Sequence, residues 1–349
     1  MGANTPGGFF SCFGELQDPA REKKLYLIHG GPGTGKSTWM KQTAEQIRKA
    51  GLTCELIRCS ADPSSLDAVR AGDGLFSVAD ATAPHAMEPR YPGAFEEVID
   101  FSPLLNSDIL AKDRERIIAL TDQNQELHRK TDGILSAASA LKNDSLAIGT
   151  RSLQTEKIKK YADRRVHVPK NSVCGTVHRR FLTAVSGRKI AFLTDFLEQC
   201  QTLTVIDDPI GSAAAFLLQR LCGRYISAGY DVYACFCTLS PASRIEHLIV
   251  PALSVGYTTS NFIHPFNRPV PHQTIHARRF YDEELLQDFR GRLGFNSRMI
   301  DALVRQAAEN ETAALSGHNE LEKLYGAAMD YDRQRQMMNR FLAELDTRS

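Results

Sequence analysis

Residues 30–37 read GGPGTGKS, the complete G-x-x-x-x-G-K-S spacing of a phosphate-binding P-loop. This motif is informative only where a strand leads into it and a helix leads out of it. Residues 24–28 (KLYLI) form a short apolar run with β-formers. Residues 37–50 (STWMKQTAEQIRKA) carry helix formers and end at Gly51, a typical residue after a helix. The sequence therefore predicts a strand, a phosphate-binding loop and a helix in succession.

The residues of this loop have distinct expected roles. Glycines allow successive backbone amides to turn toward a phosphate, and the start of the helix adds partial positive charge at the same point. We expect Lys36 to reach the β- and γ-phosphates and the Ser37 hydroxyl to bind Mg²⁺. The residues expected to hold ATP are Gly30, Gly31, Pro32, Gly33, Thr34, Gly35, Lys36, Ser37 and Thr38.

A nucleotide site of this kind also needs an acid near the metal. Asp80 follows the apolar run 75–79 (LFSVA), and an acid at the carboxyl end of a parallel strand faces the ligand crevice. We therefore predict that Asp80 is a metal ligand and acts with Lys36 in catalysis. Asp62 is the alternative acid, although its Asp-Pro sequence also explains it as a turn residue. His85 is expected to maintain loop structure, because His264 occupies the equivalent position in the second half of the chain.

The second half of the chain repeats the pattern around the loop. Residues 25–40 (LYLIHGGPGTGKSTWM) align with residues 202–217 (TLTVIDDPIGSAAAFL). Further matches follow at a nearly constant offset: Cys59 with Cys237, Asp67 with Glu246, and His85 with His264. Such ordered matches indicate an internal duplication.

The second copy lacks the residues that bind phosphate. Ala213 and Ala214 stand where the first copy has its lysine and serine, and Asp207 and Asp208 stand where it has two glycines. Two carboxylates oppose an anion, and without the lysine and hydroxyl neither a countercharge nor a metal ligand remains. We therefore expect one functional and one degenerate nucleotide site. The alternative is that residues 203–208 are the acidic Walker B strand of one larger domain.

These patterns predict an α/β fold of duplicated P-loop NTPase domains, each with a parallel, doubly wound sheet, and with long helical arms. Predicted strands are 25–29, 53–59, 75–79, 203–206, 231–237 and 253–258. A short turn near 64–69, a short helix near 243–248 and a helix at 212–227 accompany them, and the helical arms are 109–141 and 282–345. The predicted domains are 1–145 with the intact loop, a basic linker at 146–179, and 180–349 with the degenerate loop.

The second copy has an additional apolar stretch, residues 180–185 (RFLTAV), before an expected helix at 190–199. The first copy has little room for an equivalent strand. We expect either that the first sheet lacks this strand or that the true start lies upstream of Met1.

Charge and composition exclude several classes of protein. Lys plus Arg total 42 and Asp plus Glu total 41, so overall charge gives no case for nucleic acid or membrane binding. No segment approaches eighteen uninterrupted apolar residues, and the eight cysteines form no C-x-x-C pair. We expect a cytoplasmic protein that binds neither membranes nor nucleic acid and that can contact a protein partner through its helical arms.

Several segments together resemble a bacterial family of tandem P-loop proteins whose members are usually described only as ATPase or nucleotide-kinase-like. The segments are HGGPGTGKSTWMK, RCSADPSSLD, VADATAPH and EEVIDFSPLL in the first half, with CTLSPASRIEHLIVPAL and TTSNFIH in the second. The resemblance implies duplicated P-loop domains and adds no reaction. Members commonly keep a second G-x-G-K-[ST] loop, from which residues 207–214 depart.

Three functions are consistent with the sequence. The first is an Mg²⁺-dependent ATPase with one active and one degenerate site. The second is a small-molecule or nucleotide kinase, in which a loop and arginines of the arms close over an acceptor. The third is a scaffold that senses ATP without hydrolysing it.

Overall fold

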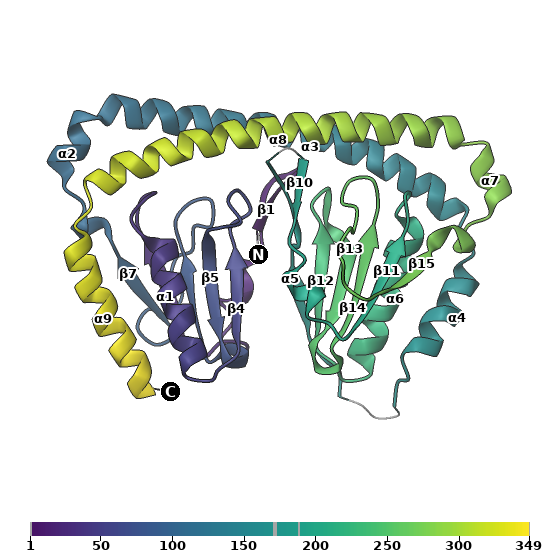
Figure 1. Ribbon diagram of the computed structural model, residues 1–349, viewed down its shortest axis with the longest axis horizontal. Coiled ribbons are helices and arrows are strands. Elements are labelled where there is room, and N and C mark those ends of the chain that lie inside the picture. The colour runs from purple at the N-terminus through teal and green to yellow at the C-terminus, as the bar shows by residue number, and fades with distance from the viewer. Residues whose placement is uncertain (1, 170–172, 188, 349) are drawn as a thin grey trace. The chain divides into compact units, whose positions relative to one another are not determined.

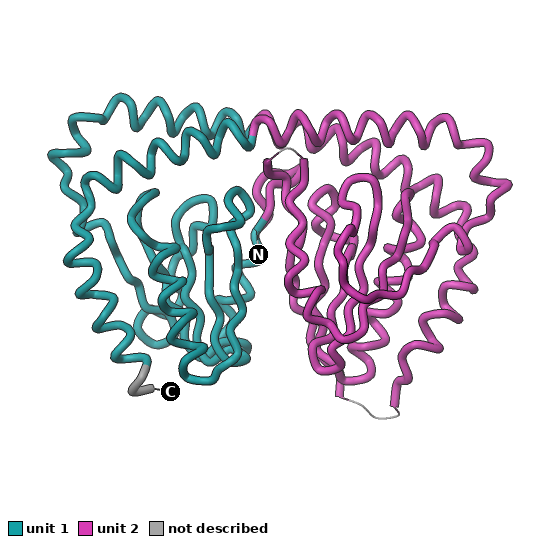
Figure 2. The backbone as a smooth tube through the Cα atoms, viewed as in Figure 1, with its two compact units in different colours: residues 1–2, 11–129, 311–349 teal, residues 3–10, 130–310 magenta. Residues whose placement is uncertain are grey.

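The structure is a computed structural model that describes residues 2–169, 173–187 and 189–348 (Figure 1). The chain forms two compact units (Figure 2). Unit 1 comprises residues 1–2, 11–129 and 311–349, and unit 2 comprises residues 3–10 and 130–310. The division differs from the ranges expected from the sequence, because the chain leaves unit 1, forms unit 2, and returns.

Unit 1 contains a five-stranded sheet with the order β4-β5-β6-β3-β7. Its strands are β3 (Leu25–His29), β4 (Cys54–Arg58), β5 (Leu66–Ala71), β6 (Phe76–Asp80) and β7 (Glu96–Asp100). Strand β3 runs parallel to both of its neighbours, β6 and β7, whereas β5 runs antiparallel to β4 and β6. The carboxyl ends of β3, β6 and β7 therefore meet at one edge of the sheet.

Unit 2 contains a six-stranded sheet with the order β15-β11-β14-β13-β12-β8. Its strands are β8 (Val177–Arg180), β11 (Thr202–Asp207), β12 (Val232–Cys237), β13 (Ser240–Val250), β14 (Val255–Ser260) and β15 (Gln273–His276). The order β12-β13-β14-β11-β15 and its strand directions match those of the unit 1 sheet, and β8 adds an edge strand. This common order agrees with the repeat in the sequence.

The fold is α/β as predicted, but both sheets are mixed: the strands around β3 and β11 are parallel, whereas β5 and β13 run antiparallel to their neighbours. The predicted turn at 64–69 and the predicted helix at 243–248 belong to the antiparallel strands β5 and β13. Short apolar runs do not distinguish a buried strand from a helix, which explains both errors. The predicted helix at 190–199 is also incorrect over most of its length. Strand β10 (Lys189–Phe192) pairs with β9 (Thr183–Ser186), and only the short helix α5 (Asp195–Glu198) follows.

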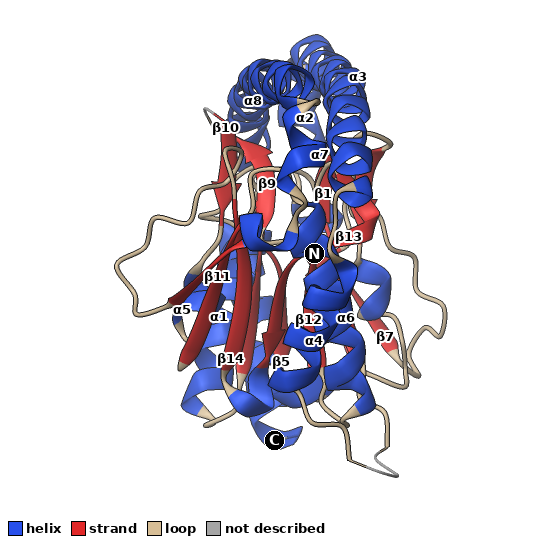
Figure 3. Cartoon of the chain, turned by 90° about the vertical axis from the view of Figure 1, so that its right-hand side faces the viewer, coloured by secondary structure: helices blue, strands red, loops and turns tan. Residues whose placement is uncertain are grey.

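The helices cover the sheets and form the predicted arms (Figure 3). The two helices that follow β3 and β11 are α1 (Lys36–Lys49) and α6 (Ser212–Ser227), as predicted. The others are α2 (Ser107–Lys112), α3 (Arg114–Arg151), α4 (Thr155–Arg165), α7 (Glu283–Gln287), α8 (Arg290–Ala327) and α9 (Tyr331–Arg348). The long helices α3 and α8 each have residues in both units.

Two further segments complete the description of the chain. The predicted basic linker 146–179 contains the end of α3, all of α4 and most of β8, and its residues 170–172 lie outside the described residues. Near the N-terminus, β1 (Gly2–Thr5) pairs with β2 (Gly8–Ser11) in a separate two-stranded sheet.

In unit 1, the C-terminal helix α9 is part of the hydrophobic core. The ring of Phe341 lies 4.9 Å from that of Tyr26 on β3 and 5.5 Å from that of Trp39 on α1, and all three side chains are buried. Met338 and Leu345 of α9 lie in the same core. Because aromatic side chains bury large apolar areas, this contact holds the end of the chain against the helix that follows the glycine-rich loop.

Replacing Phe341 with Ala should lower the free energy of unfolding of unit 1 by about 3 kcal/mol, since the change removes buried apolar area and leaves a cavity. Trp39 is the only tryptophan of the chain and touches Phe341, so urea denaturation followed by its fluorescence reports on this unit. The exposed neighbour Arg340 provides the control, and Arg340→Ala should leave the midpoint nearly unchanged. An equal midpoint in both variants would contradict the role of α9.

Candidate functional site

The first loop, residues 30–35, connects β3 to α1 at the carboxyl edge of the unit 1 sheet, which confirms the predicted strand, loop and helix order. Gly33 and Gly35 have φ angles of 67° and 83°, which side-chain-bearing residues rarely adopt. A Cβ atom at Gly33 would also lie 2.2 Å from the carbonyl oxygen of Glu322 on α8. Both the backbone conformation and the close packing therefore require glycine at this position.

Lys36 and Asp80, predicted to act together, lie beside one another. The Lys36 Nζ donates to the carbonyl oxygens of Gly30 and Gly31, each at 2.8 Å, and lies 3.6 Å from Asp80 Oδ2. Asp80 ends β6, the strand next to β3, and its Oδ1 accepts a hydrogen bond from the Thr82 amide at 2.8 Å. The ammonium group thus lies inside the loop with a carboxylate as its counterion.

The remaining predicted residues follow the course of the loop and the first turn of α1. The Ser37 Oγ accepts a hydrogen bond from the Leu66 amide at the start of β5, at 3.0 Å. The buried Thr34 hydroxyl donates to the Gly31 carbonyl at 2.8 Å and so fixes the turn around Pro32. Thr38 is exposed on the first turn of α1. The serine hydroxyl and the Asp80 carboxylate are the oxygen groups in this loop region that suit Mg²⁺.

The backbone amides of the first loop are available to an anion. Among the residues that the structure describes, no acceptor receives a hydrogen bond from the amides of Gly33, Gly35, Lys36 or Ser37. The first amides of any helix lack partners within the helix and attract negative charge. Amides without an acceptor, with a lysine beside them, are compatible with the phosphate-binding loop predicted from the sequence.

Helix α9 holds the carbonyl groups of the same loop. The Tyr331 hydroxyl donates to the Gly33 carbonyl and the Gln334 Nε2 donates to the Thr34 carbonyl, both at 2.7 Å. These bonds fix the loop through its carbonyls and leave its amides unused. The sequence analysis missed Tyr331 and Gln334, because they lie about 300 positions away in the chain and belong to no motif.

The second loop, residues 208–211, connects β11 to α6 in unit 2, and several amides of this loop and of the first turn of α6 have acceptors within the chain. The fully buried Asp208 accepts hydrogen bonds from the Ala214 amide at 2.9 Å and from the Ile210 amide at 3.2 Å. The Tyr281 hydroxyl donates to Asp208 Oδ1 at 3.0 Å and accepts from the Ala213 amide at 2.8 Å. A carboxylate and a phenol of the chain itself thus occupy the start of this helix.

A lysine from a different element lies beside the second loop. Lys142 of α3 is buried, and its Nζ donates to the Ile210 carbonyl at 3.0 Å. Burial, together with the nearby Arg244 cation, lowers the pKa of Lys142 to about 8, although the Glu246 and Asp208 charges oppose this shift. Beside its second loop, unit 2 therefore contains the Asp208 carboxylate and the Lys142 ammonium. Beside its first loop, unit 1 has amides without an acceptor and the Lys36 ammonium.

The acid and histidine positions that match between the halves are paired in both units. His85 Nε2 lies 3.1 Å from Asp67 Oδ2, and His264 Nε2 lies 3.2 Å from Glu246 Oε2, with all four side chains buried. These pairs agree with the structural role expected for His85. Burial raises the pKa of Cys59 to about 12, so its thiol stays protonated at neutral pH.

One group of side chains in unit 2 has suitable donors for a metal. Among the described residues, donor atoms of Glu246, His247 and His264 lie within 4.8 Å of one another. However, Glu246 already accepts from the buried Arg244 at 3.3 Å and pairs with His264. The buried guanidinium compensates the carboxylate charge and opposes a second cation, so we assign this cluster to the core of unit 2.

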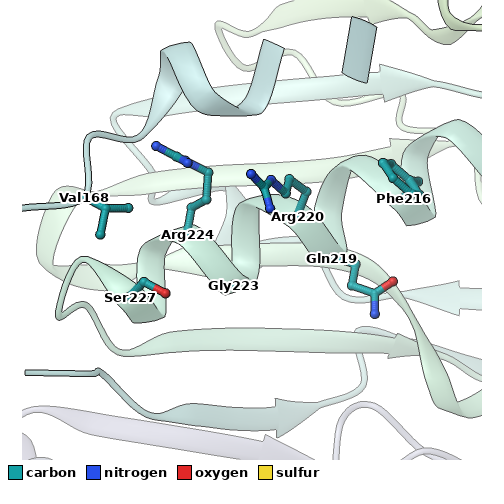
Figure 4. A pocket seen from close by; sticks show the side chains of 7 residues that line it. All are labelled: Val168, Phe216, Gln219, Arg220, Gly223, Arg224 and Ser227. Carbon is teal, nitrogen blue, oxygen red and sulfur yellow. The ribbon is translucent and has the colours of Figure 1, made fainter. Parts of the chain in front are cut away.

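A hollow of about 550 Å³ runs along α6 in unit 2 (Figure 4). Its lining side chains Arg220 and Arg224 both pair with Asp163 of α4, at 3.1 and 3.0 Å. The hollow contains none of the predicted site residues. Its residues are Val168, Phe216, Gln219, Arg220, Gly223, Arg224 and Ser227.

Comparisons with protein-family models, with curated proteins and with solved structures found no match to this chain. The family resemblance of the sequence segments therefore stays a prediction. In the described part of the chain, no helix combines the length and apolar character needed to span a membrane.

The lowered pKa of Lys142 predicts a specific pH dependence of stability. Between pH 8 and the usual lysine value of about 10.5, the unfolded chain binds a proton that the folded chain does not, so stability rises with pH in this range. The free energy of unfolding of the wild type, relative to Lys142→Met, should rise by about 2 kcal/mol from pH 8 to 9.5. Urea titrations followed by circular dichroism measure this difference, and other titrating groups cancel because both proteins contain them. A constant difference would contradict the buried position of Lys142.

Proposed function

We propose that the chain is an Mg²⁺-dependent ATPase with duplicated P-loop domains, in which the first loop binds the nucleotide and the second loop is degenerate. The observation that carries the proposal is the different state of equivalent amides in the two units. The amides of Ser37 and Thr38, the second and third residues of α1, have no acceptor among the described residues. Those of Ala213 and Ala214, the second and third residues of α6, donate to Tyr281 and Asp208. This difference supports an anion site in the first unit and its loss in the second.

The first loop supplies each group that a triphosphate requires. The unused amides would donate hydrogen bonds to phosphate oxygens, and Lys36 would exchange two carbonyl partners and Asp80 for the β- and γ-phosphates. Adenine rather than guanine is the proposed base because the sequence contains no N-K-x-D motif. The phosphates carry several negative charges, whereas the two carbonyls are neutral and Asp80 carries one, so this exchange increases the Coulomb attraction at Lys36.

Hydrolysis requires a metal ion and a positioned water. Ser37 and Asp80 would hold Mg²⁺ between the phosphates and the carboxyl end of β6, the former directly and the latter directly or through a water. Magnesium would neutralise charge on the phosphates during the reaction, and Lys36 would stabilise the leaving group. The proposed catalytic residues are therefore Lys36 and Asp80.

The test is nucleotide binding by calorimetry in the wild type and in Lys36→Ala. Loss of the ammonium should weaken ATP binding about a hundredfold, because a charge-assisted contact to the phosphates disappears. Lys41→Ala is a matched control, since Lys41 is exposed on the same helix. Equal affinity of Lys36→Ala and the wild type would contradict the proposed site.

Release of inorganic phosphate from ATP tests the reaction separately from binding. The wild type should release phosphate with Mg²⁺ and not with a chelator, and Asp80→Asn should lower the rate. Binding without phosphate release under any condition would leave the site but contradict hydrolysis.

A further inference from the structure

Unit 1 contains a cavity of about 230 Å³ beside the first loop, between α1 and α9. From α1 it is lined by Thr38, Trp39 and Gln42, and from α9 by Tyr331, Gln334 and Arg335. Gly35 of the loop also borders it, so the cavity begins where the open amides are. The cavity is therefore adjacent to the position proposed for the phosphates.

One wall of the cavity carries a buried donor without an acceptor. Trp39 is only 2% exposed, and its indole Nε1 has no hydrogen-bond partner among the described residues. The indole nitrogen can only donate, and buried donors without acceptors are rare in native proteins. This nitrogen has almost no accessible surface, so the aromatic group that the cavity offers to a ligand is the exposed ring of Tyr331.

The opposite wall carries a cation that can move. Arg335 is exposed, and its ion pair with Asp332 is long, at 3.6 Å, between side chains that are 71% and 85% exposed. Exposed pairs of this kind hold a side chain weakly. A guanidinium favours flat aromatic surfaces as well as anions, so Arg335 can cover a planar ring placed in the cavity.

We propose that this cavity receives the nucleoside moiety, base and ribose, of the nucleotide held at the first loop. The inference rests on the proposed function, which places the phosphates on the loop amides. It adds that α9 contributes to nucleotide recognition: Tyr331 and Gln334 position the loop, and Arg335 covers the base. A purine offers a planar surface to Arg335 and to the ring of Tyr331. The C-terminal helix thus becomes part of the binding site for the nucleoside.

The experiment compares ATP with inorganic tripolyphosphate, which carries the phosphates and lacks the nucleoside. Calorimetry on the full chain should show that Arg335→Ala weakens ATP binding about tenfold, the effect of losing one cation–π contact, and leaves tripolyphosphate within twofold. Arg333→Ala is the matched control, because Arg333 is exposed on the same helix and lies outside the cavity lining. It should leave both affinities unchanged.

A second variant fills the cavity from the other side. Gln42 is exposed on α1, and Gln42→Trp should likewise weaken ATP selectively. Unchanged ATP binding in both variants, or equal weakening of ATP and tripolyphosphate, would overturn the inference and leave the proposed function intact. Failure of the wild type to bind either ligand would overturn the proposed function together with the inference.

Discussion

The start of a helix presents amides that need acceptors, and the two units meet this requirement in different ways. In unit 2, the Asp208 carboxylate and the Tyr281 hydroxyl accept these hydrogen bonds, so the helix α6 needs no ligand. In unit 1, glycines occupy the positions that align with the two aspartates, and the amides before α1 have no acceptor in the described chain. The same strand order therefore supports a self-contained unit and a unit that we propose to be completed by a nucleotide.

The first loop is fixed by residues from the end of the chain. Tyr331 and Gln334 hold its carbonyls, and Phe341 packs against Trp39 on the same helix that the loop begins. Formation of the loop geometry is thus coupled to docking of α9 in unit 1. A loop that is already rigid loses less conformational entropy when a phosphate binds, so these contacts favour the proposed binding reaction.

Local sequence patterns predicted the local parts of the structure. The glycine spacing and the apolar run before Asp80 placed β3, α1 and β6 correctly, and with them the neighbouring Lys36 and Asp80. The antiparallel strands β5 and β13 were missed because short apolar runs have no distinguishing period. The contacts of Tyr331 with the loop and of Lys142 with Ile210 depend on tertiary packing between distant segments, and no local pattern encodes them.

The most direct test of this account is the number of nucleotides bound per chain. Native mass spectrometry with a slowly hydrolysed ATP analogue and Mg²⁺ counts them without assuming a reaction. The account predicts one nucleotide per chain, which is lost in Lys36→Ala. Two nucleotides per chain, or one that persists without Lys36, would show that Asp208 does not close the second loop.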